Sequence, residues 1–149
     1  MDKENILMRI QDCGIVAVVR AESADKAERI VDACMEGGVA AIELTFSVPH
    51  ADRVLETLSY KYDPKDIILG AGTVMDAATA RIAMLSGAQY IVSPYLDLET
   101  LRMCNRYRVP MMPGVMSVRE AVTAMENGAA LAGTLWTSCS SFIRCTNRT

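Results

Sequence analysis

The chain has 149 residues, of which 51% are hydrophobic and 22% are charged, and its formal net charge is −3 at pH 7. This composition is typical of a globular domain with a proper core, and it excludes an intrinsically disordered chain. The slight acidity argues against a nucleic-acid partner, because binding to phosphates requires a basic face that releases their counterions.

Apolar runs and amphipathic segments alternate along most of the chain. The apolar runs are continuous, as in strands covered on both faces, and they span residues 15–19, 40–44, 67–69, 90–92 and 109–112. Between them, helical spacing of apolar residues occurs in residues 24–36, 51–60, 77–85, 98–107 and 118–126. This alternation predicts a parallel α/β fold with five βα units and the opening of a sixth.

Local signals mark the ends of these helices. Glycines at which helices are expected to end are Gly37, Gly38, Gly87 and Gly128. Side chains that can cap the first turn of a helix are Ser23, Asp76, Asp97 and Ser117. Ser117 and Glu120 have the spacing of a capping box.

Neither a membrane nor a metal site is expected. The N-terminal residues carry charges of both signs without a signal-peptide pattern, and no run is long and apolar enough to span a bilayer. We therefore expect a cytoplasmic protein. The five cysteines form no Cys-X-X-Cys pair and His50 is the only histidine, which indicates reduced thiols rather than zinc ligands.

Glu43 is the most informative candidate for a functional residue. It lies within an apolar strand, near the C-terminal end, where parallel βα folds place their functional groups. Burial would raise its pKa toward the range of a general base. A buried ion pair with Arg20, at the end of the first strand, is the alternative. Arg20 itself could bind a substrate carboxylate or lie on the surface.

The segment from Gly70 to Thr73 is expected to form a turn between a strand and a helix. Its two glycines would let the backbone approach a ligand, and Thr73 would offer a hydroxyl group. The segment lacks the third glycine of a dinucleotide fingerprint, so no nucleotide cofactor is expected. Pro94, after the fourth strand, is expected to shape its loop.

Five segments in this order resemble consecutive motifs of the 2-keto-3-deoxy-6-phosphogluconate and 4-hydroxy-2-oxoglutarate aldolases. They are residues 14–20, 36–49, 70–74, 87–94 and 112–116, and the resemblance covers about residues 6–129. It implies a homotrimeric (β/α)8 TIM barrel without metal or cofactor. It also implies cleavage of a small 2-keto-4-hydroxy acid to pyruvate and an aldehyde through a lysine Schiff base, as in the Entner-Doudoroff pathway.

The same resemblance assigns roles to individual residues. By motif position, Glu43 corresponds to the proton-transfer glutamate and Arg20 to an arginine that meets the substrate carboxylate. Thr45 and Thr73 correspond to threonines near the pyruvyl group, and Pro94 to a loop proline beside it. These assignments make Glu43 the catalytic candidate and the other four the substrate-binding candidates.

One essential residue departs from the family pattern. The Schiff-base lysine corresponds to Gly133 here, and Lys65 is the last lysine of the chain. Residues 127–149 contain no lysine and no acidic residue. We therefore expect a partial aldolase barrel of five to six βα units over residues 1–133. Residues 134–149 would be an aberrant tail, produced by disorder, a changed reading frame or a mispredicted gene end.

Three functions remain open at this point. The first is an aldolase of this family, with this chain inactive because it lacks the Schiff-base lysine. The second is a non-catalytic barrel fragment that acts as an interaction or regulatory module. The third is another small-molecule barrel enzyme, against which the five ordered motifs argue. The motifs do not distinguish phosphorylated from unphosphorylated keto acids, nor do they settle whether this chain forms the trimer.

Overall fold

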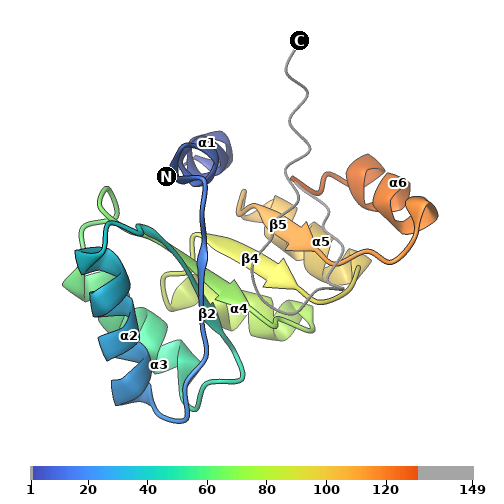
Figure 1. Ribbon diagram of the computed structural model, residues 1–149. Coiled ribbons are helices and arrows are strands. Elements are labelled where there is room, and N and C mark those ends of the chain that lie inside the picture. Colours follow the sequence, from blue (N-terminus) through green and yellow to red (C-terminus); the bar gives the residue numbers. More distant parts are fainter. Residues whose placement is uncertain (1, 131–149) are drawn as a thin grey trace.

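The computed structural model describes residues 2–130, in which strands and helices alternate along the chain (Figure 1). The described strands form one parallel sheet in sequential order from β1 to β5. Their bounds are β1 Ala17–Val19, β2 Ala41–Thr45, β3 Ile68–Gly72, β4 Tyr90–Ser93 and β5 Met111–Pro113. Parallel strands in sequential order are the arrangement of successive (β/α)-barrel units, so the predicted fold class is confirmed.

The helices between these strands follow the predicted pattern closely. Their bounds are α2 Ala24–Glu36, α3 Ala51–Lys61, α4 Ala77–Leu85, α5 Leu98–Arg106 and α6 Val118–Glu126. The four predicted capping side chains each accept a hydrogen bond from the first turn of their helix. Glu120 accepts from the Met116 N–H at 2.6 Å, one residue before the position expected for a capping box.

One helix, α1 (Lys3–Cys13), was not predicted from the sequence. The Asp2 carboxylate caps its first turn, and Gly14 ends it in the left-handed conformation with φ of 70°. Ile6 and Ile10, one helical turn apart, are its buried residues. In Figure 1 this helix lies apart from α2 and α3. Its position therefore differs from that of the helices that connect the strands.

The predicted strand positions are right, but several bounds differ. The largest correction concerns β3, which continues through Gly70 and Gly72, so this segment is strand rather than the predicted turn. Neither glycine has a positive φ. β1 is shorter than predicted, and β5 begins later and includes Pro113. Gly70 and Gly72 leave room for the side chains of Tyr90 and Glu43, which lie over them.

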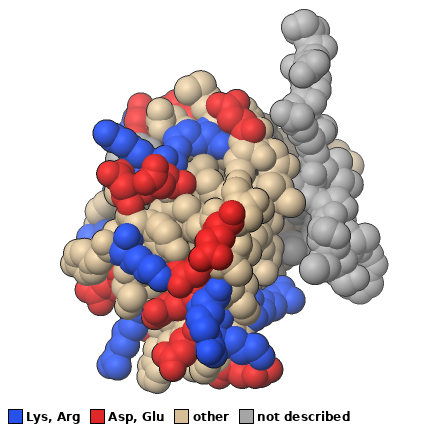
Figure 2. Space-filling view, turned by 60° about the vertical axis from the view of Figure 1, so that its left-hand side comes forward, with Lys and Arg blue, Asp and Glu red and all other residues tan. Residues whose placement is uncertain are grey.

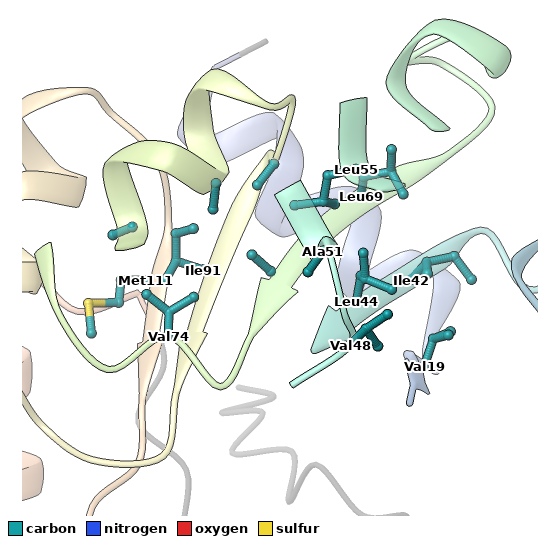
Figure 3. Close-up of a cluster of buried hydrophobic side chains, with 14 of the residues drawn as sticks. Val19, Ile42, Leu44, Val48, Ala51, Leu55, Leu69, Val74, Ile91 and Met111 are labelled. Atoms are coloured by element: carbon teal, nitrogen blue, oxygen red, sulfur yellow. The ribbon is translucent and has the colours of Figure 1, made fainter. Parts of the chain in front are cut away.

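Most of the core lies between the sheet and the helices that connect its strands. Figure 3 shows the aliphatic side chains of β2, β3 and β4 meeting those of neighbouring segments, as at Leu44, Leu55 and Ile91. A second buried cluster occupies the other face of the sheet. It joins α1 to the inward-facing strand positions and consists of Ile6, Ile10, Ala41, Ile68, Tyr90, Val92 and Met112. We call this second face the inner face of the sheet.

The inner face is only partly covered within the described residues. Val18, in the edge strand β1, is 47% exposed, whereas Val19 beside it is buried in the core on the other face of the sheet. Two strand edges, those of β1 and β5, have no partner strand among residues 2–130. The described part of the sheet thus corresponds to an incomplete barrel.

Charged side chains of both signs are interspersed over the surface seen in Figure 2. The ion pairs among the described residues lie at the surface, so each contributes little to stability. Lys61 and Asp32, joined at 2.6 Å, link α3 to α2. None of the described helices combines the length and hydrophobicity needed to cross a lipid bilayer.

Candidate functional site

Glu43 lies on the inner face of the sheet, in one row with Gly70 and Tyr90. The strand register pairs Glu43 with Gly70, and Gly70 with Tyr90. A methyl group built on Gly72 would lie 1.9 Å from the Glu43 Oε1 atom, so the carboxyl group rests over this glycine. Glycine at this position is therefore what makes room for the Glu43 side chain.

The Glu43 carboxyl group is buried and has no hydrogen-bond partner among residues 2–130. The residue is 6% exposed, and its carboxyl group accepts no hydrogen bond from any described residue. Burial raises its pKa from the ordinary value of 4.5 to about 7, and the charge of Arg20 opposes this shift. The group is consequently poised to take up and release a proton near neutral pH.

Arg20 follows β1 and does not form the buried ion pair considered above. Its side chain is exposed, and none of the ion pairs among the described residues joins it to Glu43. The guanidinium is nevertheless close enough to influence the Glu43 carboxylate electrostatically. The structure thus places a cation beside the carboxyl group without neutralising it.

Thr45 is the last residue of β2 and is completely buried. Its hydroxyl group donates to the Val19 carbonyl oxygen at 3.2 Å and lies 2.8 Å from the Ser47 Oγ atom. These contacts tie the C-terminal ends of β1 and β2 together. They also fix the backbone immediately before Arg20.

Thr73 adjoins the site in a strained conformation. It directly follows Gly72 and has φ of 59°, which is rare for a β-branched residue. Adjacent Cα atoms lie about 3.8 Å apart, so the Glu43 carboxyl group and the Thr73 Cα atom are within roughly 8 Å. Hydrogen bonds on either side hold this segment: Phe46 N–H donates to Gly72 at 2.8 Å, and Val74 N–H to Val92 at 3.2 Å.

Pro94 belongs to the same edge of the sheet but lies farther from Glu43. It follows β4, two strands away from β2, and strands in a sheet are spaced by about 4.8 Å. Its neighbour Ser93 accepts a hydrogen bond from Gly114 N–H at 2.8 Å, which joins the loops after β4 and β5. The structure therefore brings Glu43 and Thr73 together, whereas Pro94 is placed at the rim.

Sequence reasoning missed Tyr90 as a neighbour of Glu43. The ring of Tyr90 lies over Gly70, with its Cζ atom 2.1 Å from where a methyl group on that glycine would be. The tyrosine is fully buried, and its hydroxyl group has no hydrogen-bond partner in the described part of the chain. The sequence signal that could have indicated this contact was a tyrosine at the start of an apolar run, Tyr90 to Val92. The preceding strand carries Gly70 and Gly72, which leave space for a large side chain.

None of the described lysines reaches the inner face. The Lys3 amino group donates to Asn105 and to the Gly128 carbonyl oxygen, each at 3.0 Å. Lys26 and Lys61 pair with acidic side chains on the outside of the sheet, and Lys65 precedes β3. Gly133, the position that corresponds to the Schiff-base lysine, lies outside the described residues, as does the proposed tail over 134–149.

A hollow of about 270 Å³ lies at the opposite edge of the sheet from Glu43. Its lining includes Ile6 of α1, Gln89 before β4 and Val109 before β5. Gln89 and Val109 precede the N-terminal ends of their strands, so the hollow lies away from the candidate site. Within residues 2–130, no three His, Cys, Asp or Glu side chains are grouped to hold a metal ion.

Known proteins resemble this chain in both sequence and structure. A family model described as KDPG and KHG aldolase matches residues 6–133. The 2-dehydro-3-deoxy-phosphogluconate aldolase of Treponema pallidum is 31% identical over 117 residues, which are 78% of this chain and 55% of that protein. The 2-dehydro-3-deoxy-6-phosphogalactonate aldolase of Escherichia coli is 30% identical over 115 residues, 77% of this chain and 56% of that protein.

A solved structure of the KDPG aldolase from Legionella pneumophila, with pyruvate captured as a covalent carbinolamine intermediate, aligns with a TM-score of 0.69. It is 28% identical, and the alignment covers 76% of this chain and 54% of that one. The chain spans about half the length of the curated relatives it matches. These matches confirm the resemblance found in the sequence: the chain belongs to the KDPG and KHG aldolase family.

Proposed function

We propose that the Glu43 site binds a 2-keto acid and transfers protons in a retro-aldol cleavage that yields pyruvate and an aldehyde. The substrates would be 2-keto-3-deoxy-6-phosphogluconate or 4-hydroxy-2-oxoglutarate. The observation that carries the proposal is the buried Glu43 carboxyl group, unpaired among the described residues, in a chain that matches the aldolase family over residues 6–133. The names of the relatives support the reaction class.

Glu43 has the properties that this proton transfer requires. With a pKa of about 7, the carboxyl group is present in both protonation states at neutral pH. It can therefore accept the proton of a 4-hydroxyl group as the C3–C4 bond breaks and can return a proton to C3 of the product. A positioned acid–base group of this kind contributes about 10²–10⁴-fold to a rate.

The other candidates would hold the keto acid at the rim of the sheet. Arg20 would meet the substrate carboxylate, because a guanidinium binds a carboxylate through two parallel hydrogen bonds. Thr73 would face the pyruvyl group, and Pro94 would limit the pocket beside it. Thr45 would act mainly by holding the ends of β1 and β2 together, since its hydroxyl group is engaged with Val19 and Ser47.

We further propose that the 149-residue polypeptide does not turn over on its own. A class I aldolase requires an amine that forms an imine with the keto group, because the imine draws electrons from the breaking bond. Lys65 is the last lysine in the sequence, and Gly133 stands at the matching position. Without the amine, Glu43 can still transfer protons, but no imine forms to accept the electrons of the breaking C3–C4 bond.

A non-catalytic role is the second candidate, favoured by exposed apolar side chains. Val18 is 47% exposed on the inner face, and α6 exposes Val118, Val122 and Met125 at helical spacing. A binding module with these surfaces would not need the lysine. It would also not need the carboxyl group of Glu43, which is costly to bury. That cost favours the keto-acid site over the module.

Two measurements on the purified chain test this function. Pyruvate is titrated into isotope-labelled protein, and amide shifts are expected at Thr73 and Glu43, with weaker binding in Arg20→Lys and unchanged binding in the control Arg29→Lys. Borohydride is then added with pyruvate, and intact mass is expected to stay unchanged. Absence of shifts at the site would contradict the keto-acid pocket, whereas a covalent adduct on a lysine would contradict inactivity.

A further inference from the structure

Tyr90 carries a buried polar group that the proposed reaction does not use. Its hydroxyl group is fully enclosed and has no protein partner among the described residues. Leaving a buried hydroxyl group unpaired is costly, so each such group calls for a physical explanation. A phenylalanine would fill the same space over Gly70 without that cost.

Two glycines of β3 leave room for the side chains of Tyr90 and Glu43 on the same face of the sheet. The Tyr90 ring covers Gly70, and the Glu43 carboxyl group covers Gly72 on the same face of β3. Positions two residues apart on a strand are separated by about 7 Å. No other side chain stands between them on β3, because the intervening Ala71 points to the opposite face.

The Tyr90 hydroxyl group and the Glu43 carboxyl group can be joined across this spacing in two ways. The Glu43 side chain has three rotatable bonds, so its carboxyl group can turn from Gly72 toward Gly70. Alternatively, one water molecule making two hydrogen bonds of about 2.8 Å spans most of the distance. Either arrangement gives the Tyr90 hydroxyl group an acceptor and gives the Glu43 carboxylate a donor.

We propose that Tyr90 is a positioning residue that donates a hydrogen bond to the ionised carboxylate of Glu43, directly or through one water molecule. Donation to the charged form stabilises it, so Tyr90 sets the protonation state of the acid–base group. The proposal rests on the assigned role of Glu43, but the pairing itself requires neither substrate nor turnover.

Few other titratable groups face this pair among the described residues. Arg20, from the end of β1, acts on Glu43 and favours its charged form. Cys13, from the end of α1, acts on Tyr90. Within residues 2–130, neither Arg20 nor Cys13 forms a hydrogen bond or ion pair with Glu43 or Tyr90. A change in the titration of Glu43 on removal of one hydroxyl group can therefore be traced to that hydroxyl group.

The test follows the Glu43 carboxyl carbon by NMR across a pH titration, with Glu43→Gln to assign the signal. Removal of a hydrogen bond to a charged group in Tyr90→Phe is expected to raise the midpoint by about one to two pH units. Tyr60→Phe, which removes an exposed hydroxyl group on α3, is the matched control and should leave the midpoint in place. An unchanged or lowered midpoint in Tyr90→Phe would overturn the proposal.

A second readout leaves Tyr90 intact, in case the Tyr90→Phe variant folds poorly. Ring carbon signals of labelled Tyr90 should titrate with the same midpoint as Glu43, and this titration should vanish in Glu43→Gln. If the Tyr90 ring signals do not change as Glu43 ionises, the tyrosine is only a packing residue. Both readouts are made without keto acid, so failure of pyruvate to bind would leave them interpretable.

Discussion

Gly72 lies directly beneath the Glu43 carboxyl group, and Gly72→Ala would test whether this packing holds the carboxyl group in its buried position. The added methyl group would lie 1.9 Å from the Glu43 Oε1 atom, whereas Cβ atoms in proteins essentially never lie within 3.0 Å of another heavy atom in such contacts. Gly72 has no positive φ, so alanine is compatible with the backbone. The overlap is with the far end of a flexible side chain, which must move.

The expected consequence is a change in titration rather than a large loss of stability. An off-rotamer Glu43 side chain costs about 0.5–1.5 kcal/mol, and alanine in a strand gains about 0.5–1 kcal/mol over glycine. The free energy of unfolding should therefore change by less than about 1 kcal/mol. Displacement toward solvent should lower the pKa of Glu43 from about 7 toward the ordinary value of 4.5.

Two other glycines provide the comparison. Gly70→Ala would place a methyl group 2.1 Å from the ring of Tyr90, which is rigid and fully buried, so a loss of about 1–3 kcal/mol or more is expected. Gly37→Ala, whose nearest neighbours would be at 3.3 and 3.4 Å, should stay within about 0.5 kcal/mol of wild type. Urea unfolding and carboxyl NMR measure both effects. A Gly72→Ala variant whose Glu43 still titrates near pH 7 would refute the packing described here.

Three further predictions concern stability. Folded Glu43 keeps its proton up to about pH 7, whereas the unfolded chain loses it near 4.5, so stability should fall by roughly 3 kcal/mol as pH rises across this window. Glu43→Gln should flatten this fall in urea titrations, and parallel profiles for the two proteins would contradict the raised pKa. Thr45→Val should cost about 1 kcal/mol through the lost bond to Val19, and no loss would show that this bond is not needed. Ile6→Ala should cost about 2–5 kcal/mol, against less than about 0.5 for the exposed Met8→Ala, and equal effects would mean that α1 does not pack on the inner face.

The parts of the fold that could be predicted from sequence are those with local causes. Ser23 and Asp97 cap helices because each side chain bonds an N–H three residues ahead, a relation visible in the sequence. Gly87 and Gly128 end helices because their positive φ suits residues without a side chain. Alternating apolar and amphipathic segments likewise predicted the parallel βα units, because each strand is followed by a helix that returns the chain to the next strand.

The parts that were missed depend on contacts between distant segments. The glycines of β3 were assigned to a turn, because local propensity says nothing of the Tyr90 ring and Glu43 carboxyl group that need the space. Helix α1 is mostly polar, and only its packing against inner-face residues such as Ile68 explains why Ile6 and Ile10 are buried. The environment of Glu43 was foreseen as buried, but its freedom from an ion pair required the structure.

The measurement that tests the central claim most directly is the ionisation of Glu43 in the 149-residue chain, followed by carboxyl NMR and assigned with Glu43→Gln. A buried acid–base group of a keto-acid site should titrate with a midpoint near pH 7, because burial outweighs the nearby charge of Arg20. A midpoint near 4.5 would show a solvated carboxylate, and the proposed role of this site in proton transfer would then be wrong.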